Sequence, residues 1–104
     1  MKVWLDDWRP APEGWVHVRT PEEAIEVLRG GDVEAISLDH DLGLAEGLRE
    51  RTGYDVLLWL EREVEAGRAR PPAVMEVHSG NVAVMKRMEQ AIESIRRLAE
   101  TGRG

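Results

Sequence analysis

Cysteine is absent from this 104-residue sequence, so the chain can form neither disulfide bonds nor active sites that depend on a thiolate. A reducing compartment is the simplest setting for such a composition, and we expect a cytoplasmic protein. No apolar run approaches the length that spans a bilayer, and no targeting peptide precedes the first strand-like residues. The sequence therefore excludes thiol chemistry and predicts no interaction with a membrane.

Positive charge is also scarce, because 14 basic residues face 20 acidic ones and the net charge is −6. Proteins that bind duplex nucleic acid usually carry a basic face, so we expect no such partner. A small anionic ligand held by a metal or by a local arginine stays compatible with this balance. Lysine is restricted to Lys2 and Lys86, and Asn81 is the single asparagine. This composition is typical of GC-rich, thermophilic sources.

Strand-like and helix-like segments alternate along the chain. Segments 2–5, 15–19, 33–39 and 73–77 have the pattern of β-strands. Apolar residues at helical spacing follow the second, third and fourth of these segments, in 20–31, 52–67 and 81–100. The order β-β-α-β-α-β-α predicts one α/β domain over residues 1–100, with a parallel sheet, helices on both faces and a frayed tail at 101–104.

Two local signals refine this outline. Thr20 followed by Pro21 is a strong helix start, because Thr caps the first turn and Pro has its φ already set for the first helical position. The first connection, residues 8–14, contains two prolines and a glycine. We therefore expect a loop there in place of a crossover helix.

Acidic and imidazole side chains follow three of the four expected strands. In an open parallel α/β sheet, ligands bind outside the carboxyl ends of the strands. We therefore expect three separate segments to bring their titratable groups to one edge of the sheet. These segments are Asp6-Asp7, Asp39-His40-Asp41 and His78-Ser79-Gly80-Asn81.

Such crowding of carboxylates requires compensation. Two carboxylates about 4 Å apart repel each other by about 4 kcal/mol at an effective dielectric constant near 20. Three of them need raised pKa values or a cation, and an oxygen-only ligand set suits Mg²⁺ or Mn²⁺. Asp6 and Asp7 are the metal-ligand candidates, and Asp39 is a third ligand or a nucleophile. The competing interpretation is that these are solvated carboxylates at strand ends, but their convergence favours a site.

The pattern resembles the receiver domain of response regulators. Receivers have an acidic pair after the first strand, a phosphoacceptor Asp after the third, and Ser or Thr after the fourth. Asp6-Asp7, Asp39 and Ser79 match these positions. In an ordinary receiver, a fifth strand ends in a lysine that contacts the phosphoryl group. Here both that strand and the first crossover helix are missing.

The chain resembles still more closely a receiver-like family proposed to process cyclic phosphates. The matching motifs are LDDWRPAPEGW (5–15), SLDHDLG (37–43) with Gly53-Tyr54-Asp55, and VHSGN (77–81) with Arg87-Met88. This resemblance implies a receiver-like (flavodoxin-like) open parallel sheet in the strand order 2-1-3-4. It also implies a metal-binding acidic pocket and two added histidines.

The histidines at this edge are candidates for proton transfer. An imidazole with a pKa near 6.5 exchanges protons readily at neutral pH, and opening a cyclic phosphate needs one group to activate water and another to protonate the departing oxygen. His40 and His78 therefore become the catalytic candidates, together with Asp39. The alternative for each histidine is a hydrogen bond to the backbone. His17 lies inside a strand, and we interpret it as structural.

Five further residues are candidates for substrate binding, each with a competing structural role. Arg9 either clamps a phosphate or pairs with the acids beside it. Asp41 either orients a histidine or assists the metal, or else caps the following loop. Ser79 and Asn81 are placed to donate to a phosphate oxygen, although Asn81 also suits the cap of the last helix. Arg87 either reaches the pocket or remains a surface arginine.

The sequence thus predicts a metal-dependent phosphoesterase that acts on a cyclic phosphate or a related phosphodiester end, with Mg²⁺ or Mn²⁺ as cofactor. Its partner is a small phosphate-containing ligand or an RNA end. The alternative is a non-enzymatic receiver-like module for signalling or protein binding, which binds Mg²⁺ or takes a phosphoryl group on Asp39. Trp8 and Trp15 either stack on a base or pack in the loop. An open sheet edge also allows a homodimer.

Overall fold

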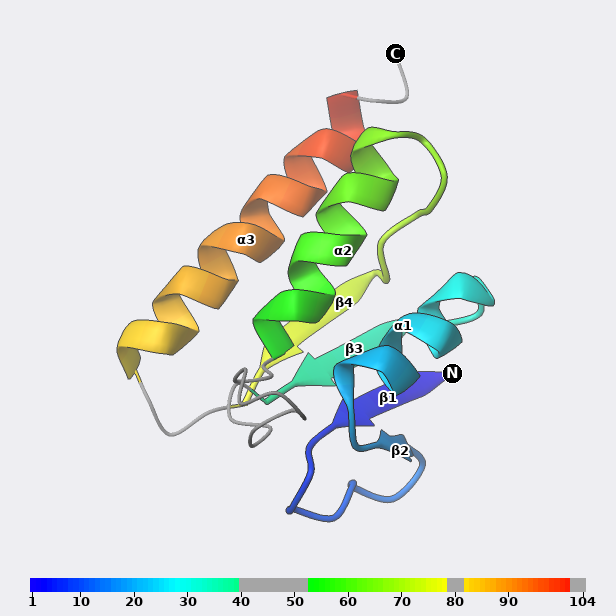
Figure 1. The fold of residues 1–104 in the computed structure, drawn as a ribbon, viewed down its shortest axis with the longest axis vertical. Coiled ribbons are helices and arrows are strands. Elements are labelled where there is room, and N and C mark those ends of the chain that lie inside the picture. Colours follow the sequence, from blue (N-terminus) through cyan, green and yellow to red (C-terminus); the bar gives the residue numbers. More distant parts are fainter. Residues whose placement is uncertain (40–52, 79–81, 102–104) are drawn as a thin grey trace, which may run out of the picture.

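Seven regular elements make up the part of the chain that the computed structural model describes, residues 1–39, 53–78 and 82–101 (Figure 1). In chain order they are β1 (Lys2–Leu5), β2 (Val16–Val18), α1 (Pro21–Arg29), β3 (Ala35–Leu38), α2 (Gly53–Glu65), β4 (Val74–Val77) and α3 (Val82–Thr101). This is the order expected from the sequence. None of the described helices has the length and apolar character needed to cross a membrane.

The start of α1 shows how local sequence sets these boundaries. Thr20 is extended, with φ −131° and ψ 154°, and its Oγ1 accepts a hydrogen bond from the Glu23 N–H at 3.1 Å. Pro21 begins the helix, and Gly30 caps its other end. The expected capping signals are therefore confirmed.

All four strands are parallel, in the order β2-β1-β3-β4. This confirms the receiver-like order 2-1-3-4, and it brings the carboxyl ends of the strands to one edge of the sheet. The connection from Leu5 to Val16 contains no helix, which confirms that the first crossover helix is missing. Within the described residues the sheet ends at β4, and no fifth strand follows it.

The hydrophobic core lies on a single face of the sheet. Val3, Leu5, Ile36 and Leu38 project from β1 and β3 into one cluster with α1, α2 and α3. Figure 1 shows the three helices side by side along the sheet, with α2 next to α3 over most of its length. The expectation of helices on both faces is therefore wrong for the described residues.

The direction of the crossovers explains this one-sided arrangement. The β2–α1–β3 and β3–α2–β4 connections step along the sheet in the same direction. Right-handed crossovers that step in the same direction place their helices on the same face. The β1–β2 connection steps the other way, so a helix there would cover the opposite face. Residues 6–15 form a loop instead.

Aromatic side chains cover part of the face that no described helix covers. Trp4 of β1 and Trp15 meet edge to face, with ring centroids 6.2 Å apart and planes at 80°. The Lys2 ammonium lies 5.9 Å from the centroid of the Trp15 ring, within cation–π range. Aromatic and charged side chains therefore lie on the face against which the first crossover helix of a receiver would pack.

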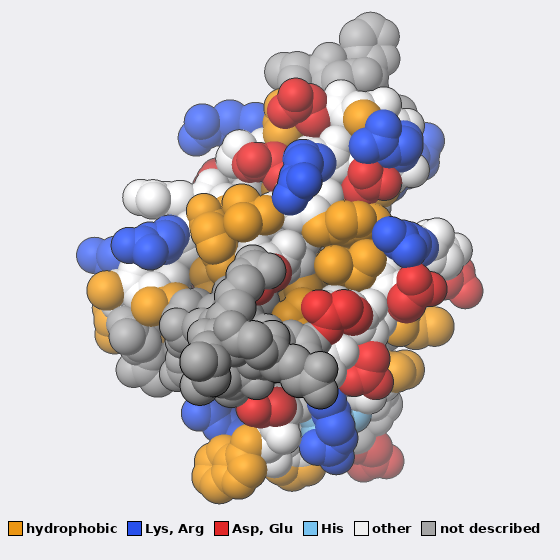
Figure 2. Space-filling view, in the orientation of Figure 1, with side chains coloured by type: hydrophobic (Ala, Val, Ile, Leu, Met, Phe, Trp, Pro, Cys, Tyr) orange, Lys and Arg blue, Asp and Glu red, His pale blue; other side chains and the backbone are white. Residues whose placement is uncertain are grey.

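Charged side chains of both signs are interspersed on the face of the molecule seen in Figure 2. Among the described residues of that face, the Lys and Arg side chains form no continuous basic area. This distribution agrees with the acidic composition.

Gly53 allows α2 to begin against the end of β3. Its N–H donates to the Asp39 carbonyl oxygen at 3.0 Å. A Cβ atom at position 53 would clash with that oxygen and lie 3.1 Å from the Leu38 Cβ. The absence of a side chain at Gly53 is therefore a condition for placing Asp39 where it is.

We predict that Gly53→Ala lowers the free energy of unfolding by about 1–3 kcal/mol, because the added methyl group overpacks a backbone contact. Gly30→Ala is the matched control. Gly30 has an ordinary helical backbone, with φ −67° and ψ −19°, so this variant is expected to stay within about 1 kcal/mol of the parent. Urea denaturation measures both values. Equal stability of the two variants would contradict the close approach at Gly53.

Candidate functional site

Asp6, Asp39 and His78 form one row across the sheet, one residue beyond the ends of β1, β3 and β4. Each donates its backbone N–H to the carbonyl oxygen of the last residue of a neighbouring strand, at 2.9–3.1 Å. Side chains alternate between the two faces of a strand. All three side chains of this row therefore leave the sheet on the face opposite the core, as Trp4 and Ser37 do two residues earlier.

The acidic cluster consists of Asp6, Asp7 and Asp39. One carboxylate oxygen from each residue lies within 4.8 Å of the other two. Asp6 and Asp39 are only 1% and 7% exposed, whereas Asp7 faces solvent. At such separations each pair of carboxylates repels by several kcal/mol, on the order of 4 kcal/mol at 4 Å. The expected convergence of these acids is confirmed, and three oxygen ligands open to water on one side fit Mg²⁺ or Mn²⁺.

The Asp6 carboxylate is held by the loop that follows it. Its Oδ1 accepts hydrogen bonds from the backbone N–H groups of Trp8 and Arg9, both at 2.8 Å. Its Oδ2 contacts His78 Nε2 at 3.1 Å and lies 3.9 Å from the Arg9 Nη1. An Asp that closes a turn in this way has its orientation fixed before any ligand binds.

These contacts also set the charge of Asp6. Burial raises the pKa of its carboxyl, but the hydrogen bonds from the Arg9 and Trp8 backbone and from His78 outweigh burial and lower the pKa below its ordinary value. Asp6 is therefore ionised at neutral pH. An ionised carboxylate is the form that a divalent cation binds.

His78 connects the acidic cluster to the sheet. Its Nδ1 lies 2.7 Å from Ser37 Oγ, its Nε2 lies 3.1 Å from Asp6 Oδ2, and its ring stacks on Trp4 with centroids 3.7 Å apart and planes at 6°. Ser37 is 3% exposed, so this chain of contacts starts inside the molecule. The imidazole therefore has a fixed plane and two engaged nitrogen atoms.

The tautomer of His78 follows from its partners. Burial lowers the pKa of this imidazole, and its effect exceeds the opposing hydrogen bond to Asp6, so the neutral ring is favoured. Ionised Asp6 can only accept, so Nε2 must carry the proton. Nδ1 is then the acceptor of the Ser37 hydroxyl. Ser37, His78 and Asp6 form a directed hydrogen-bond chain that ends at the acidic cluster.

The remaining described candidates lie at different distances from this centre. Arg9 belongs to the same turn as Asp6, and its carbonyl oxygen accepts from Trp4 Nε1 at 3.3 Å. His17 donates from Nε2 to the Asp6 carbonyl oxygen at 2.7 Å, a backbone contact of the kind expected for a structural histidine. Arg87 is exposed on α3, and no contact among the described residues joins it to the acidic cluster.

Four of the residues expected at this site lie outside the described residues. They are His40, Asp41, Ser79 and Asn81. Their assignments stay predictions from the sequence.

Three residues of the site were not assigned a role from the sequence. Ser37 and Trp4 orient His78, and Gly53 allows α2 to approach Asp39. The alternation of side chains along a strand could have indicated Ser37 and Trp4. Each lies between two core residues, so its side chain leaves the sheet on the opposite face. No short-range signal marks Gly53, since its requirement arises from contact with a distant strand.

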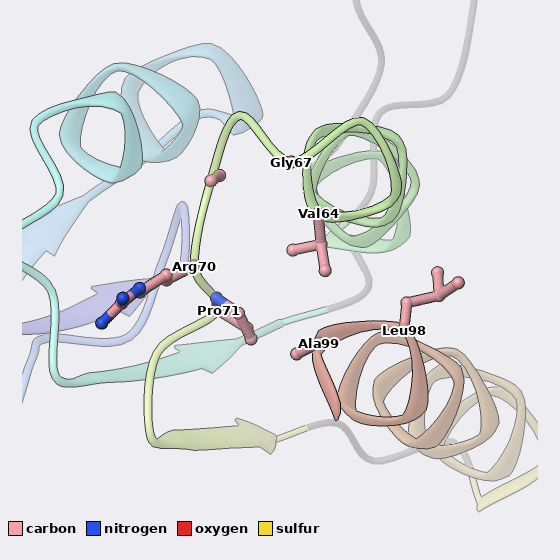
Figure 3. A pocket seen from close by; sticks show the side chains of 7 residues that line it. Val64, Gly67, Arg70, Pro71, Leu98 and Ala99 are labelled. Carbon is pink, nitrogen blue, oxygen red and sulfur yellow. The ribbon is translucent and has the colours of Figure 1, made fainter. Parts of the chain in front are cut away.

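A cavity of about 380 Å³ lies at the opposite end of the sheet from the acidic cluster (Figure 3). It is lined by the ends of α2 and α3, including Val64 and Leu98, and by the segment before β4, including Pro71. Its walls are mostly apolar, and the side chain of Arg70, although this residue lines the cavity, extends away from Val64 and Leu98. None of the acidic-cluster residues lines it, so it is separate from the candidate site.

We predict that Ser37→Ala lowers the free energy of unfolding by about 1–3 kcal/mol, because a buried nitrogen of His78 loses its donor. Ser94→Ala, at a half-buried serine of α3, is the matched control and should change stability little. Urea denaturation measures both variants. Long-range ¹H–¹⁵N spectra of the unmodified protein should show neutral His78 with its proton on Nε2. A proton on Nδ1 would contradict the hydrogen-bond chain.

Comparison with known proteins agrees with this geometry. Residues 1–94 match the family model described as the cyclic-phosphate processing receiver domain. No curated protein and no solved structure matches the chain. The match covers most of the sequence, including Asp6, Asp39 and His78. With its receiver-like sheet and acidic edge, this chain belongs to the cyclic-phosphate processing receiver domain family.

Proposed function

We propose that this protein is a metal-dependent phosphoesterase that opens a cyclic phosphate or cleaves a related phosphodiester end. The observation that carries the proposal is the acidic cluster, because Asp6, Asp7 and Asp39 converge within 4.8 Å at the carboxyl edge of the sheet. The family description supplies the substrate class, a cyclic phosphate. An acidic site binds a phosphate anion when a cation lies between them. The acidic cluster and the family description therefore both support a metal-dependent reaction on a phosphate.

In this proposal Asp6, Asp7 and Asp39 hold Mg²⁺ or Mn²⁺. When bound, the cation offsets the repulsion among the three carboxylates and draws electron density from a phosphate oxygen. The protein fixes Asp6 through two backbone N–H groups and His78, so this ligand needs little reorganisation. Exposed Asp7 and buried Asp39 complete the set from two different strand ends.

Proton transfer is assigned to His40 and His78. Water attacks the phosphorus, one ester P–O bond breaks, and the products are a phosphomonoester and a free hydroxyl. One proton leaves the attacking water, and one joins the departing oxygen. In neutral His78, Nε2 carries the proton and faces Asp6, and Nδ1 is engaged by Ser37, so the proton that His78 can offer in the reaction is the one on Nε2.

Substrate contacts are assigned to Arg9, Asp41, Ser79, Asn81 and Arg87. Arg9 has the strongest support among them, because its guanidinium lies 3.9 Å from the Asp6 carboxylate and is half exposed. A phosphate at the acidic cluster would therefore lie within reach of this cation. Asp41, Ser79, Asn81 and Arg87 complete the assignment from the sequence motifs.

A second candidate function is a receiver-like module that takes a phosphoryl group on Asp39 or switches on Mg²⁺ binding. The position of Asp39 favours it, since this buried carboxylate follows the third strand beside an acidic pair, as in a receiver. Among the described residues no strand follows β4, and the two lysines of the sequence, Lys2 and Lys86, lie on β1 and α3. Incubation with a small phosphodonor and Mg²⁺, followed by intact-mass measurement, distinguishes the two functions.

We predict that Mn²⁺ or Mg²⁺ at ten times its Kd stabilises the protein by about 1.4 kcal/mol. For a domain of this size, each kcal/mol of added stability raises the Tm by about 4–8 °C. Asp7→Asn should remove this increase without lowering the metal-free Tm, because Asp7 is exposed and the substitution relieves repulsion among the carboxylates. Asp39→Asn should remove it as well.

Asp32→Asn is the matched control for metal binding. Asp32 is an exposed carboxylate in the loop before β3, at the opposite edge of the sheet, so the metal effect should persist in this variant. Thermal denaturation with and without the cation gives each value. If millimolar Mn²⁺ and Mg²⁺ leave the Tm of the parent protein unchanged, the metal site is refuted. A protein-binding function without metal would then be favoured.

We predict metal-dependent turnover of a 2′,3′-cyclic nucleotide, with kcat lowered about 10²- to 10⁴-fold in His40→Ala and in His78→Ala. His17→Gln is the control, because glutamine can still donate to the Asp6 carbonyl oxygen. This variant should keep most of its activity. Product formation is followed for cyclic and linear phosphoesters, with and without Mn²⁺.

Two results would contradict this assignment. Equal turnover by the parent protein, His40→Ala and His78→Ala would remove the histidines from the reaction. A stable phosphate adduct from the phosphodonor experiment, lost in Asp39→Asn, would replace hydrolysis by the receiver-like function.

A further inference from the structure

Trp8 is the most exposed of the large hydrophobic side chains in the described part of the chain, at 82%. Proteins rarely leave an indole in water, since its burial removes a large apolar area. The other three tryptophans have packing partners: Trp4 and Trp15 contact each other, and Trp59 lies partly buried against the core. Trp8 therefore differs from them in contributing nothing visible to the core.

The turn that carries Trp8 is fixed without its indole. Asp6 Oδ1 accepts from the backbone N–H groups of Trp8 and Arg9, and Trp4 Nε1 donates to the Arg9 carbonyl oxygen. Each of these contacts uses the backbone of Trp8 or another residue. A substitution of the Trp8 side chain should therefore leave both the turn and the fold intact.

Trp8 also lies between groups suited to a phosphate ligand. It directly follows Asp7 of the acidic cluster, and consecutive Cα atoms are about 3.8 Å apart. On its other side is Arg9, whose Nη1 lies 3.9 Å from Asp6 Oδ2. Four consecutive residues thus present two cation-binding carboxylates, an exposed aromatic face and a guanidinium.

We propose that the Trp8 indole is a stacking platform for the base of a nucleotide whose phosphate binds at the acidic cluster. This inference rests on the proposed function and narrows its substrate class to phosphoesters that carry a nucleobase, in preference to cyclic phosphates of simple sugars or polyols. Stacking on an aromatic side chain is favourable for every base. The site would therefore accept nucleotides with little sequence preference.

The experiment compares two cyclic phosphates that share the reacting group. 2′,3′-Cyclic AMP carries a base, and ethylene phosphate is a five-membered cyclic phosphodiester without one. Hydrolysis of each is measured with Mn²⁺ for the parent protein, Trp8→Ala and Trp8→Phe. For 2′,3′-cyclic AMP, Trp8→Ala should lower kcat/KM at least about fivefold. The loss should appear mainly in KM, because the base lies away from the reacting atoms.

Trp8→Phe keeps an aromatic face and should restore most of the lost kcat/KM. Ethylene phosphate should be hydrolysed equally by all three proteins. An equal loss on both substrates, or no loss on either, would overturn the stacking role while leaving the phosphoesterase function standing. If the parent protein with Mn²⁺ hydrolyses neither substrate, the proposed function fails and the stacking role fails with it.

Discussion

The buried carboxylate of Asp6 joins the fold of this protein to its chemistry. It closes the turn after β1 through two backbone N–H groups, it accepts from His78 at the end of β4, and it belongs to the acidic cluster. Burial alone would favour its neutral form, and these donors reverse that preference. The ionised form of Asp6 therefore depends on contacts at the ends of β1 and β4. The geometry of the site thus requires that these strands are correctly placed in the sheet.

The one-sided helix layer gives this site its surroundings. The β1–β2 connection contains no helix, and among the described residues Trp4 and Trp15 cover part of the face that carries Asp6, Asp39 and His78. Stacking on Trp4 fixes the imidazole plane, and Ser37 fixes its tautomer. The loss of a crossover helix thus leaves room for an aromatic support beneath a polar site.

Hydrophobic periodicity predicted the order of elements, and the common edge of parallel strands predicted the convergence of the acids. The strand order was expected from the resemblance to receiver domains. The prediction failed on the face occupied by the helices, although a 2-1-3-4 order with right-handed crossovers already implies a single face for α1 and α2. The roles of Ser37 and Gly53 could not be read directly, since each depends on contacts with residues distant in sequence. Local patterns predict elements well, whereas side-chain partners depend on their packing.

The distribution of cations bears on which phosphate chemistry the site can support. A phosphoryl group on Asp39 would add negative charge to an already acidic cluster. Of the two lysines, Lys2 lies at the start of β1, about 13 Å along the strand from Asp6, and its ammonium faces Trp15; Lys86 is exposed on α3. Arg9 lies beside the cluster, with its Nη1 3.9 Å from Asp6 Oδ2, and is half exposed, and Arg19 Nη1 donates to the Asp7 carbonyl oxygen at 3.4 Å. A divalent metal would therefore be the stronger source of compensation for the negative charge of a phosphate at this cluster.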